Sequence, residues 1–504
     1  MVYGAALEMR FGGNPIEGSN PSLSATLHPY QYPPATDSLT PSQTAEGAAR
    51  ALVLTKGGHA MRTLLTRGAT LVAALTLFVA SAGPATASGQ RFVQISTGDY
   101  HTCGLTSRGT AYCWGYNGDG QLGDGTTTNS EDDGPQAVIG GLKFASISAG
   151  EEHTCGLTSR GTAYCWGANT DGELGDGTTD SSGEDGPQAV IGGLKFASIS
   201  AGDDHTCGLT TRGTAYCWGD NGNGELGDGT TTDSEDDGPQ AVIGGLKFVS
   251  LDVGYYHTCG LTSRGAAYCW GYNGYGELGD GTTTDSEDDG PQAVIGGLEF
   301  ASISSGYLFT CGLTSGGAAY CWGFNDYGQL GDGTTTGSED DGPQAVIGGL
   351  KFASLSADSY YHTCGLTSRG AAYCWGYNGR GELGDGTTTD SDEDGPQAVI
   401  GGLKFASIQT GGYHTCGLTS RGAAYCWGAN GDGQLGDGTE ENSDEDGPQR
   451  VIGGLKFARL GSDGYHNCGL TSRGAAYCWG WNEYGQLGDG TMTDSDENGP
   501  QAVQ

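Results

Sequence analysis

Two cysteines separated by nine residues recur eight times along this chain, and no other feature constrains the fold as strongly. The first copy reads HTCGLTSRGTAYCWG over residues 101–115, and later copies follow at intervals of 52 residues, once 53. Repeats of about 50 residues indicate stacked units or a propeller. Short β-rich segments bounded by glycine run through every copy, without a helical stripe of apolar residues. The sequence therefore predicts an all-β repeat protein.

The segment between the two cysteines predicts a β-hairpin. Thr106-Ser-Arg-Gly-Thr110 fits a three-residue loop with Gly109 in the left-handed conformation. That register places Cys103 opposite Cys113, within disulfide range. Free buried thiols are the alternative, and zinc is disfavoured because the chain has no close C-x2-C pair. The predicted disulfides are Cys103–Cys113, Cys155–Cys165, Cys207–Cys217, Cys259–Cys269, Cys311–Cys321, Cys364–Cys374, Cys416–Cys426 and Cys468–Cys478.

The two ends of the repeat region predict a closed ring. Each unit is read as four strands, for example residues 135–139, 143–148, 153–158 and 162–166, with a Gly-Gly hairpin turn after the first. The first unit lacks the Pro-Gln-Ala-Val strand, and the chain ends on one, so the N- and C-terminal strands are expected to complete one blade. The predicted fold is an all-β, closed propeller of eight four-stranded blades. Seven blades plus one loose repeat are the alternative.

The segment before the repeats predicts export. Residues 61–87 combine a basic start, an apolar core and an A-x-A site, as in a signal peptide, and the core is too short to span a membrane. Residues 1–60 are then either upstream sequence translated in error or a disordered leader. The propeller is assigned to residues 91–504. Paired cysteines suit the same compartment, so the protein is expected to be secreted or at the cell surface.

The residues after the second cysteine carry a family resemblance. The pattern W-G-x-N-x-x-G-[QE]-L-G-D-G occurs in all eight copies, first as residues 114–125, and resembles the regulator of chromosome condensation repeat over residues 91–504. The resemblance implies a β-propeller. In that family a nuclear member exchanges nucleotide on a small GTPase, a plant ultraviolet-B photoreceptor uses the tryptophans of a G-W-R-H-T motif, and a secreted propeller inhibits β-lactamase through aromatic loops. Gly150-Glu-Glu-His-Thr154 lacks the photoreceptor tryptophan, so the secreted inhibitor is the nearest analogy.

Loops that differ between copies mark one face as the binding surface. Antiparallel order puts the residues before each His-Thr-Cys and those after each Trp-Gly at one end of the blades, where Tyr, Trp and Arg favour a protein partner. Drift in unselected loops and a glycan ligand are the alternatives. The net charge of −38 disfavours nucleic acid. The candidate partner-binding residues are Tyr255, Tyr256, Tyr272, Tyr275, Tyr307, Phe324, Tyr327, Tyr360, Tyr361, Tyr377, Arg380, Trp481 and Tyr484.

Other repeated polar residues are interpreted as structural. The histidine before each Thr-Cys is assigned to packing, because Phe309 replaces it in the fifth copy, and the Gly-Asp-Gly aspartates are assigned to turns. No cofactor or metal site is predicted, although the acidic run at residues 130–133 leaves calcium open. No unique residues pair an acid with a base, so an enzyme is not expected. A lyase or glycosidase is the alternative, and blade-specific carboxylates in the central channel would favour it.

Overall fold

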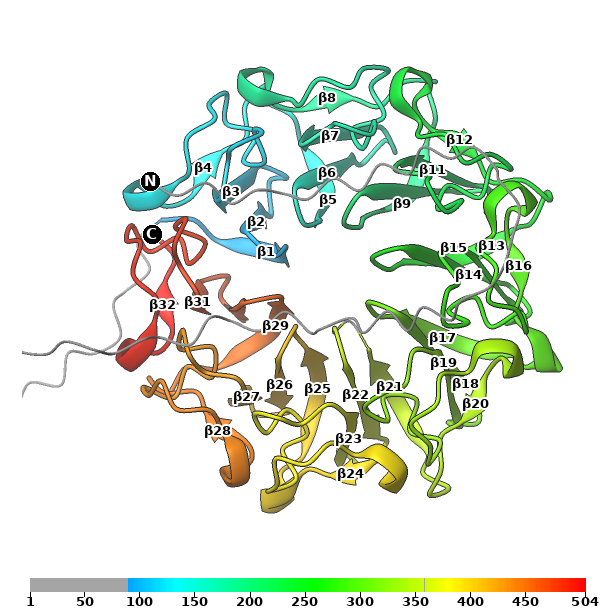
Figure 1. The fold of residues 1–504 in the computed structure, drawn as a ribbon. Coiled ribbons are helices and arrows are strands. Elements are labelled where there is room, and N and C mark those ends of the chain that lie inside the picture. The colour runs from blue at the N-terminus through cyan, green and yellow to red at the C-terminus, as the bar shows by residue number, and fades with distance from the viewer. Residues whose placement is uncertain (1–88, 358) are drawn as a thin grey trace, which may run out of the picture. The chain divides into compact units, whose positions relative to one another are not determined.

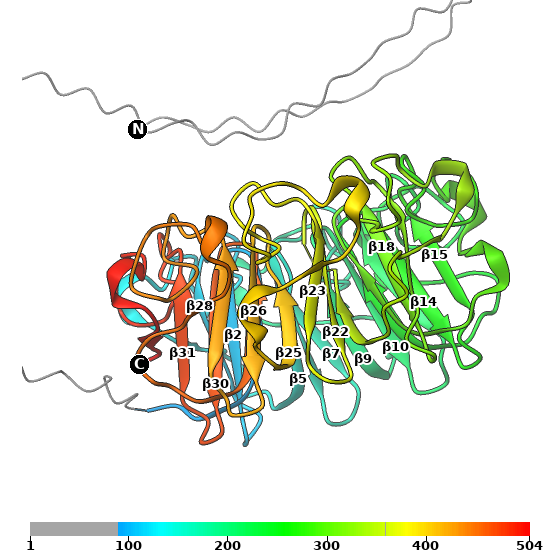
Figure 2. The same cartoon turned by 90° about the horizontal axis from the view of Figure 1, so that it is seen from below.

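The computed structural model describes residues 89–504, except residue 358. The predicted signal peptide at residues 61–87 and the predicted upstream segment at residues 1–60 lie outside this range. The described residues form eight four-stranded antiparallel sheets, each built from one continuous stretch of chain. They are arranged as the blades of a propeller around a central channel (Figure 1). Figure 2 shows the blades side by side, and none of the helices within the described range could cross a bilayer.

Every blade repeats the same four strands, so blade 1 comprises β1–β4 and blade 8 comprises β29–β32. The innermost strands are β1 (Phe92–Thr97), β5 (Phe144–Ala149), β9 (Phe196–Ala201), β13 (Phe248–Val253), β17 (Phe300–Ser305), β21 (Phe352–Ser356), β25 (Phe405–Thr410) and β29 (Phe457–Asp463). The second strands are β2 (His101–Thr106), β6 (His153–Thr158), β10 (His205–Thr210), β14 (His257–Thr262), β18 (Phe309–Thr314), β22 (His362–Thr367), β26 (His414–Thr419) and β30 (His466–Thr471).

The outer half of each blade follows the same plan. The third strands are β3 (Ala111–Gly115), β7 (Ala163–Gly167), β11 (Ala215–Gly219), β15 (Ala267–Gly271), β19 (Ala319–Gly323), β23 (Ala372–Gly376), β27 (Ala424–Gly428) and β31 (Ala476–Gly480). The outermost are β4 (Gln136–Ala137), β8 (Gln188–Ala189), β12 (Gln240–Ala241), β16 (Gln292–Ala293), β20 (Gln344–Ala345), β24 (Gln397–Ala398), β28 (Gln449–Arg450) and β32 (Gln501–Ala502).

Short 3-10 turns complete each blade, and the turn that precedes the outermost strand carries the acidic run. The ten turns are η1 (Glu131–Asp133), η2 (Gly183–Asp185), η3 (Glu235–Asp237), η4 (Glu287–Asp289), η5 (Ile295–Gly297), η6 (Glu339–Asp341), η7 (Asp392–Asp394), η8 (Ile400–Gly402), η9 (Asp444–Asp446) and η10 (Asp496–Asn498).

The predicted hairpins and disulfides are confirmed. In blade 1, Cys103 pairs with Cys113 across β2 and β3, and Gly109 takes a φ of 76° in the loop that joins these strands. All eight predicted pairs are bonded, with Sγ–Sγ distances between 2.05 and 2.10 Å. No free cysteine occurs among the described residues. The disulfides fasten the two middle strands of each blade.

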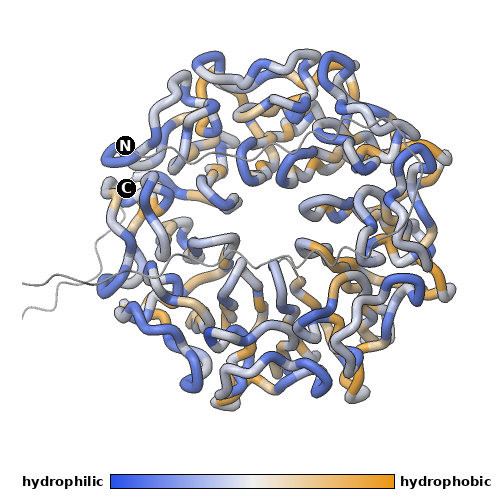
Figure 3. The backbone as a smooth tube through the Cα atoms, in the orientation of Figure 1, coloured by the Kyte–Doolittle hydropathy of each residue, from blue (hydrophilic) through white to orange (hydrophobic). Residues whose placement is uncertain are grey.

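One buried tryptophan fills each gap between neighbouring blades. Trp166 of blade 2 is fully buried against Leu105, Leu122 and the first disulfide of blade 1, and Phe144 packs beside it at 5.6 Å between ring centroids. An equivalent cluster lies at every other junction, and Trp114 forms the one between blades 8 and 1. Figure 3 shows hydrophilic segments both in the outer loops and beside the central channel. The ring therefore has a core of eight apolar layers.

The prediction that the terminal strands share a blade is wrong. Each Pro-Gln-Ala-Val strand pairs with the preceding cysteine strand of its own unit, for example Gln136 with Cys113, and Val138 enters the core of that unit. This happens because the long segment after each Trp-Gly returns to the free outer edge of the same sheet. Gly140 and Gly141, with φ of 82° and 67°, consequently form a link to the next blade and not a hairpin turn.

The ring nevertheless closes, by contacts between complete blades. The Phe92 amide donates to the Gly474 carbonyl at 2.8 Å, as the Phe144 amide donates to Gly109 between blades 1 and 2. Figure 1 shows β1 beside β29. Eight complete blades therefore replace the alternative of seven blades and a loose repeat. The same hydrogen bonds join the Ser-Arg-Gly turns to the interblade links at one end of the ring, which we call the turn face.

Candidate functional site

The opposite end of the ring, which we call the loop face, carries the segments that vary between blades. The Tyr116 amide donates to the Tyr100 carbonyl at 3.0 Å, so the segment after Trp-Gly lies against the loop before the histidine, as predicted. In this loop, the residue two places before the histidine or Phe309 lines the cavity of the channel in blades 1–4 and adjoins an equivalent residue of another blade in blades 5–8. We call these eight residues the mouth ring, which in chain order is Asp99, Glu151, Asp203, Tyr255, Tyr307, Tyr360, Gly412 and Gly464.

The predicted aromatic residues of blades 4–6 form one continuous network on the loop face, which we call the aromatic arc. Tyr307 contacts both Tyr255 and Tyr256, with ring centroids 5.2 and 5.4 Å apart, and Tyr327 contacts Tyr361 at 5.4 Å. Nearly all these contacts are edge-to-face or tilted, which is the favourable geometry for aromatic rings. The arc consists of Tyr255, Tyr256, Tyr272, Tyr275, Tyr307, Phe324, Tyr327, Tyr360, Tyr361 and Tyr377, all of them half-buried.

One of the remaining three candidates adjoins the arc, and two lie elsewhere on this face. Arg380 stacks over Tyr413 of blade 7, with its guanidinium carbon 5.0 Å from the ring centroid, and Tyr413 contacts Tyr360 of the arc at 5.4 Å. Trp481 and Tyr484 form a separate cluster at the junction of blades 8 and 1, together with Tyr100, Tyr116 and Tyr465. The sequence reading missed Tyr100, Tyr413 and Tyr465, although alignment of the position before each histidine across all eight blades reveals them.

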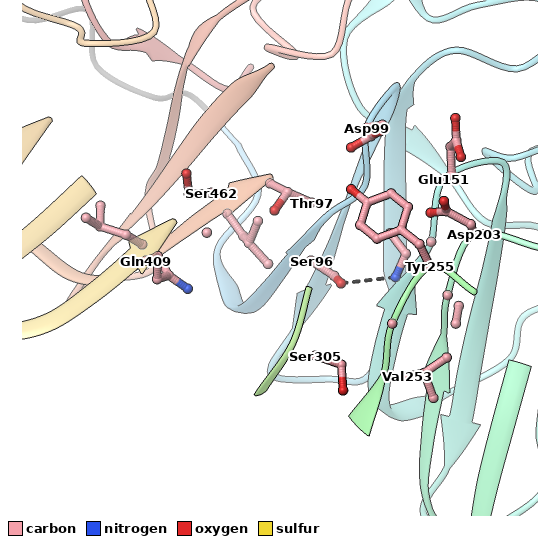
Figure 4. Close-up of a pocket in the computed structure, with 18 residues that line it drawn as sticks. Ser96, Thr97, Asp99, Glu151, Asp203, Val253, Tyr255, Ser305, Gln409 and Ser462 are labelled. Atoms are coloured by element: carbon pink, nitrogen blue, oxygen red, sulfur yellow. Dashed lines mark hydrogen bonds between the residues drawn. The ribbon is translucent and has the colours of Figure 1, made fainter. Parts of the chain in front are cut away.

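A cavity of 320 Å³ opens in the central channel beneath the mouth ring. Residues from blades 1–5, 7 and 8 line it, and Figure 4 shows Asp99, Glu151 and Asp203 close to Tyr255, with Ser305 and Gln409 on other parts of the wall. Neighbouring inner strands are joined around the channel by bonds such as that from the Ala149 amide to Ser96 Oγ, 3.0 Å long. Hydrogen bonds of this kind therefore link neighbouring blades along the wall, and the side chains at the mouth distinguish one side of it from the other.

Carboxyl groups crowd the side of the mouth formed by blades 1–3. Burial, reinforced by the negative charges of Asp99 and Asp204, raises the pKa of Glu151 to about 8, and Glu151 shares a side-chain hydrogen bond with Asp203. The Tyr360 hydroxyl donates to Asp99 Oδ2 at 3.4 Å from the opposite side of the ring. Asp99 itself is only 5% exposed. The group formed by Glu151 and Asp203 therefore retains a proton near neutral pH.

Other buried carboxyl groups lie near the loop face without facing the channel. In blades 2, 3, 4 and 6 they are the Glu of the pattern Trp-Gly-x-Asn-x-x-Gly-Glu, where the other blades carry Gln, and they bind backbone amides two residues before them, as Glu173 Oε2 accepts from the Asp171 amide at 3.0 Å. Burial raises the pKa of Glu173 to about 7 and the pKa of Glu277 and Glu382 to about 8. Burial and the charge of Glu225 raise the pKa of Asp220 to about 8.

The histidines form a belt of hydrogen bonds between blades. His153 Nε2 lies 2.7 Å from Thr206 Oγ1, and His466 Nε2 of blade 8 lies 2.6 Å from Thr102 Oγ1 of blade 1. His414 bonds Asn467 in the same way. Burial lowers the pKa of each member to about 3 or about 4, so the imidazoles are neutral: His101, His153, His205, His257, His362, His414 and His466.

Blade 5 interrupts the belt with an apolar contact. Phe309 is fully buried against Ala357, in the loop of blade 6 that carries the extra residue of the 53-residue step. Thr363 Oγ1 therefore has no histidine partner and keeps only the bond that the equivalent threonines also make, to the Gln329 carbonyl at 3.3 Å. The phenylalanine at position 309 and the longer loop of blade 6 therefore pack together in place of the histidine contact.

The aspartates and acidic runs have local explanations. Asp124 Oδ1 accepts from the amide of Thr126 at 2.9 Å, which confirms the predicted turn role. The carboxyl groups of Glu131, Asp132 and Asp133 are exposed on η1. In the described part of the chain, no group of three or more His, Cys, Asp or Glu side chains is arranged to hold a metal ion.

These features define a class: a repeat propeller with a constant turn face and a loop face that varies from blade to blade. The RCC1-like domain model matches residues 64–404, and models of the regulator of chromosome condensation (RCC1) repeat match residues 405–434, 421–470 and 464–486. The chain belongs to the RCC1-repeat family.

Two curated relatives support this assignment. The ultraviolet-B receptor UVR8 of Arabidopsis thaliana is 31% identical over 77% of this chain and 87% of its own length. The human E3 ubiquitin-protein ligase HERC2 is also 31% identical over 68% of this chain, which spans only 7% of HERC2.

Solved structures show the same fold at lower identity. Human WBSCR16 aligns with a TM-score of 0.57 at 20% identity, covering 72% of this chain and all of that one. Prp20p of Saccharomyces cerevisiae aligns with a TM-score of 0.54 at 23% identity, covering 71% and 91% respectively. Prp20p itself binds Gsp1p and histones.

Proposed function

We propose that this chain is a secreted, non-catalytic propeller that binds a protein partner through the aromatic arc. The observation that carries the proposal is the unequal distribution of side chains over an otherwise eightfold scaffold. Ten aromatic side chains from blades 4–6 form one half-buried network on the loop face. Tyrosines supply large contact areas at little entropic cost, and they dominate the energetics of protein interfaces.

Secretion is supported by the disulfides and by the sequence of residues 61–87. Eight structural disulfides persist in an oxidising compartment and are rare in the cytosol. The same reasoning opposes nucleotide exchange on a small GTPase, because such partners are intracellular. A photoreceptor role is opposed by the residues before the histidine, where the photoreceptor motif G-W-R-H-T has a tryptophan. Blade 2 carries Glu151-Glu152 there and blade 4 carries Tyr255-Tyr256.

Catalysis is the second candidate, because the channel does hold blade-specific carboxyl groups. Glu151, with its raised pKa, and Asp203 resemble the acid and base of a glycosidase. However, such enzymes hold their carboxyl groups about 5–9 Å apart so that the scissile bond fits between them. Glu151 and Asp203 hydrogen-bond directly to each other. This arrangement leaves no room for the substrate bond, which favours binding over hydrolysis.

The test is capture of a partner from the extracellular fraction of the source cells by residues 88–504. Changing Tyr255, Tyr256, Tyr360 and Tyr361 to alanine should abolish capture of a partner identified with the wild-type protein. The matched control changes four arginines on the turn face to alanine and should leave capture intact: Arg108, Arg160, Arg212 and Arg264. Undiminished capture by the tyrosine variant would place the interface elsewhere. Release of sugars from a polysaccharide panel, lost in Glu151→Gln, would instead favour the enzyme.

A further inference from the structure

We propose that the mouth of the central channel binds a lysine or arginine side chain of the protein partner, between the carboxyl groups of blades 1–3 and the tyrosine rings of blades 4–6. The inference rests on the proposed function, since it assigns a chemistry to the centre of the same face. The mouth ring is divided by charge: three acids occupy consecutive blades, and three tyrosines occupy the next three. A cation with N–H donors complements both halves.

The acidic half supplies negative charge. Asp99, Glu151 and Asp203 line the cavity, and no lysine or arginine is found among the described residues that line it. Glu151 shares a hydrogen bond with Asp203, so a proton holds these two like-charged groups together. An ammonium or guanidinium group would replace that proton and satisfy both carboxylates, as charged partners do in desolvated sites.

Two further polar groups of the cavity wall point to a ligand that donates hydrogen bonds. Ser305 is only 4% exposed, yet its Oγ has no hydrogen-bond partner within the described part of the chain. The amide oxygen Oε1 of Gln409, on another blade, is likewise buried without a partner there. Both residues line the same cavity as the carboxyl groups (Figure 4). Buried acceptors are nearly always satisfied in folded proteins, so these atoms indicate a ligand with N–H groups.

The tyrosine half supplies aromatic rings. Tyr255, Tyr307 and Tyr360 lie in mutual contact, with ring centroids 5.2, 5.6 and 5.7 Å apart. The hydrogen bond from the Tyr360 hydroxyl to Asp99 joins this cluster to the acidic half. Aromatic rings beside carboxylates attract ammonium and guanidinium groups through the ring quadrupole, and the attraction strengthens where water is excluded.

Glycines in the last two blades give the mouth its shape. A Cβ at Gly412 would lie 2.7 Å from Cε2 of Tyr360, and a Cβ at Gly464 would lie 2.8 Å from Cγ of Asp99. Any other residue at either position would displace one of these two side chains. Both glycines therefore preserve the contact between the tyrosine and acidic halves.

The experiment separates this inference from the proposed function. N-acetyl-lysine N-methylamide is titrated into residues 88–504 by calorimetry, with N-acetyl-norleucine N-methylamide as the uncharged probe of similar shape. The lysine probe should bind about tenfold more tightly than the norleucine probe, and Glu151→Gln/Asp203→Asn should remove that preference. The control Asp132→Asn/Asp133→Asn, on the exposed turn η1, also converts two carboxyl groups to amides and should change nothing. Binding at pH 7 should also release a proton in the wild type and in this control but not in Glu151→Gln/Asp203→Asn, measured as a dependence on buffer ionisation enthalpy.

Each outcome decides one of the two proposals. Equal binding of the lysine and norleucine probes, or an unchanged preference in Glu151→Gln/Asp203→Asn, would overturn the cation site even if the aromatic arc captures a partner. Free 1,5-diaminopentane that binds as tightly as the lysine probe, with no captured partner, would assign the site to small amines and overturn the protein source. A captured partner whose affinity falls about tenfold with Glu151→Gln/Asp203→Asn supports both.

Discussion

The hydrogen bond between His466 and Thr102 joins the only neighbouring blades of the ring that no peptide link connects, and Thr102→Val removes it. Thr102 is fully buried, and its hydroxyl also donates to the Gln486 carbonyl at 3.4 Å. Because the single hydroxyl proton serves that carbonyl, Nε2 of His466 carries the donated proton of the 2.6 Å bond. Valine keeps the shape of threonine and leaves this buried donor without an acceptor.

The size of the effect follows from the matched position in blade 6. Thr363 is equally buried and donates to the Gln329 carbonyl at 3.3 Å, but Phe309 stands where the histidine would be. Thr363→Val therefore loses only the bond to the carbonyl. Leaving the histidine donor unsatisfied costs about 1–3 kcal/mol in addition, and Thr102→Val should be less stable than Thr363→Val by that amount.

Equilibrium urea unfolding of both variants, with disulfides intact, measures the difference. Hydrogen exchange adds a local readout: the Phe92 amide, bonded to Gly474 across the junction, should exchange faster in Thr102→Val but not in Thr206→Val, which removes the same type of bond between blades 2 and 3. Equal destabilisation by Thr102→Val and Thr363→Val would refute the assigned role of the histidine belt. Unchanged exchange at Phe92 would refute its role in ring closure.

Three further predictions concern the scaffold. The melting temperature should be highest between about pH 5 and 7. At higher pH the folded protein loses stability, because buried carboxyl groups with a raised pKa, such as Glu277, release protons that only the folded state binds. At lower pH it loses stability because the seven histidines are protonated in the unfolded chain but stay neutral in the folded one. A maximum above pH 8 would contradict these signs. Cys103→Ala/Cys113→Ala should lower the unfolding free energy by about 3 kcal/mol, because a short loop is no longer closed, and thiol titration of the unfolded wild type should detect none. Calcium should leave the melting temperature unchanged, since the carboxylates of η1 are exposed and solvated; a shift abolished by Asp132→Asn would show a calcium site.

Much of the fold was predictable because the turn chemistry repeats. Gly109 and its equivalents fix the loop length, the loop length fixes the register, and the register brings each cysteine opposite its partner. The assignment of the Pro-Gln-Ala-Val strand failed because it rests on sequence order alone. Whether Gln136 joins the sheet before it or the sheet after it depends on the path of residues 116–135, whose turns are set by buried contacts of Asn117. Those contacts become visible only in three dimensions.

The sequence predicted which face of the ring carries the candidate site, but not that the site is centred on the mouth of the channel. Antiparallel order correctly places the varying loops at one end of the ring, and residue type identifies the tyrosines of blades 4–6. Which of two adjacent residues approaches the channel is a matter of side-chain direction, so Asp99 and Glu151 were not linked to Tyr360 across the ring. Trp481 and Tyr484 were grouped with the aromatic arc by composition, whereas the structure places them in a cluster at the closing junction.

An eightfold scaffold makes its exceptions informative. The eight residues of the mouth ring occupy equivalent backbone positions, so they are under the same packing constraints. If the mouth ring had only a structural role, one side chain would recur in all blades, as it nearly does in the histidine belt. The mouth ring instead carries acids on three consecutive blades, tyrosines on three and glycines on two. Packing explains the glycines, which make room for Tyr360 and Asp99. It does not explain why carboxyl groups gather where burial raises the pKa of Glu151 and destabilises the fold. A ligand that neutralises these carboxyl groups would account for their position at the mouth despite the loss of stability.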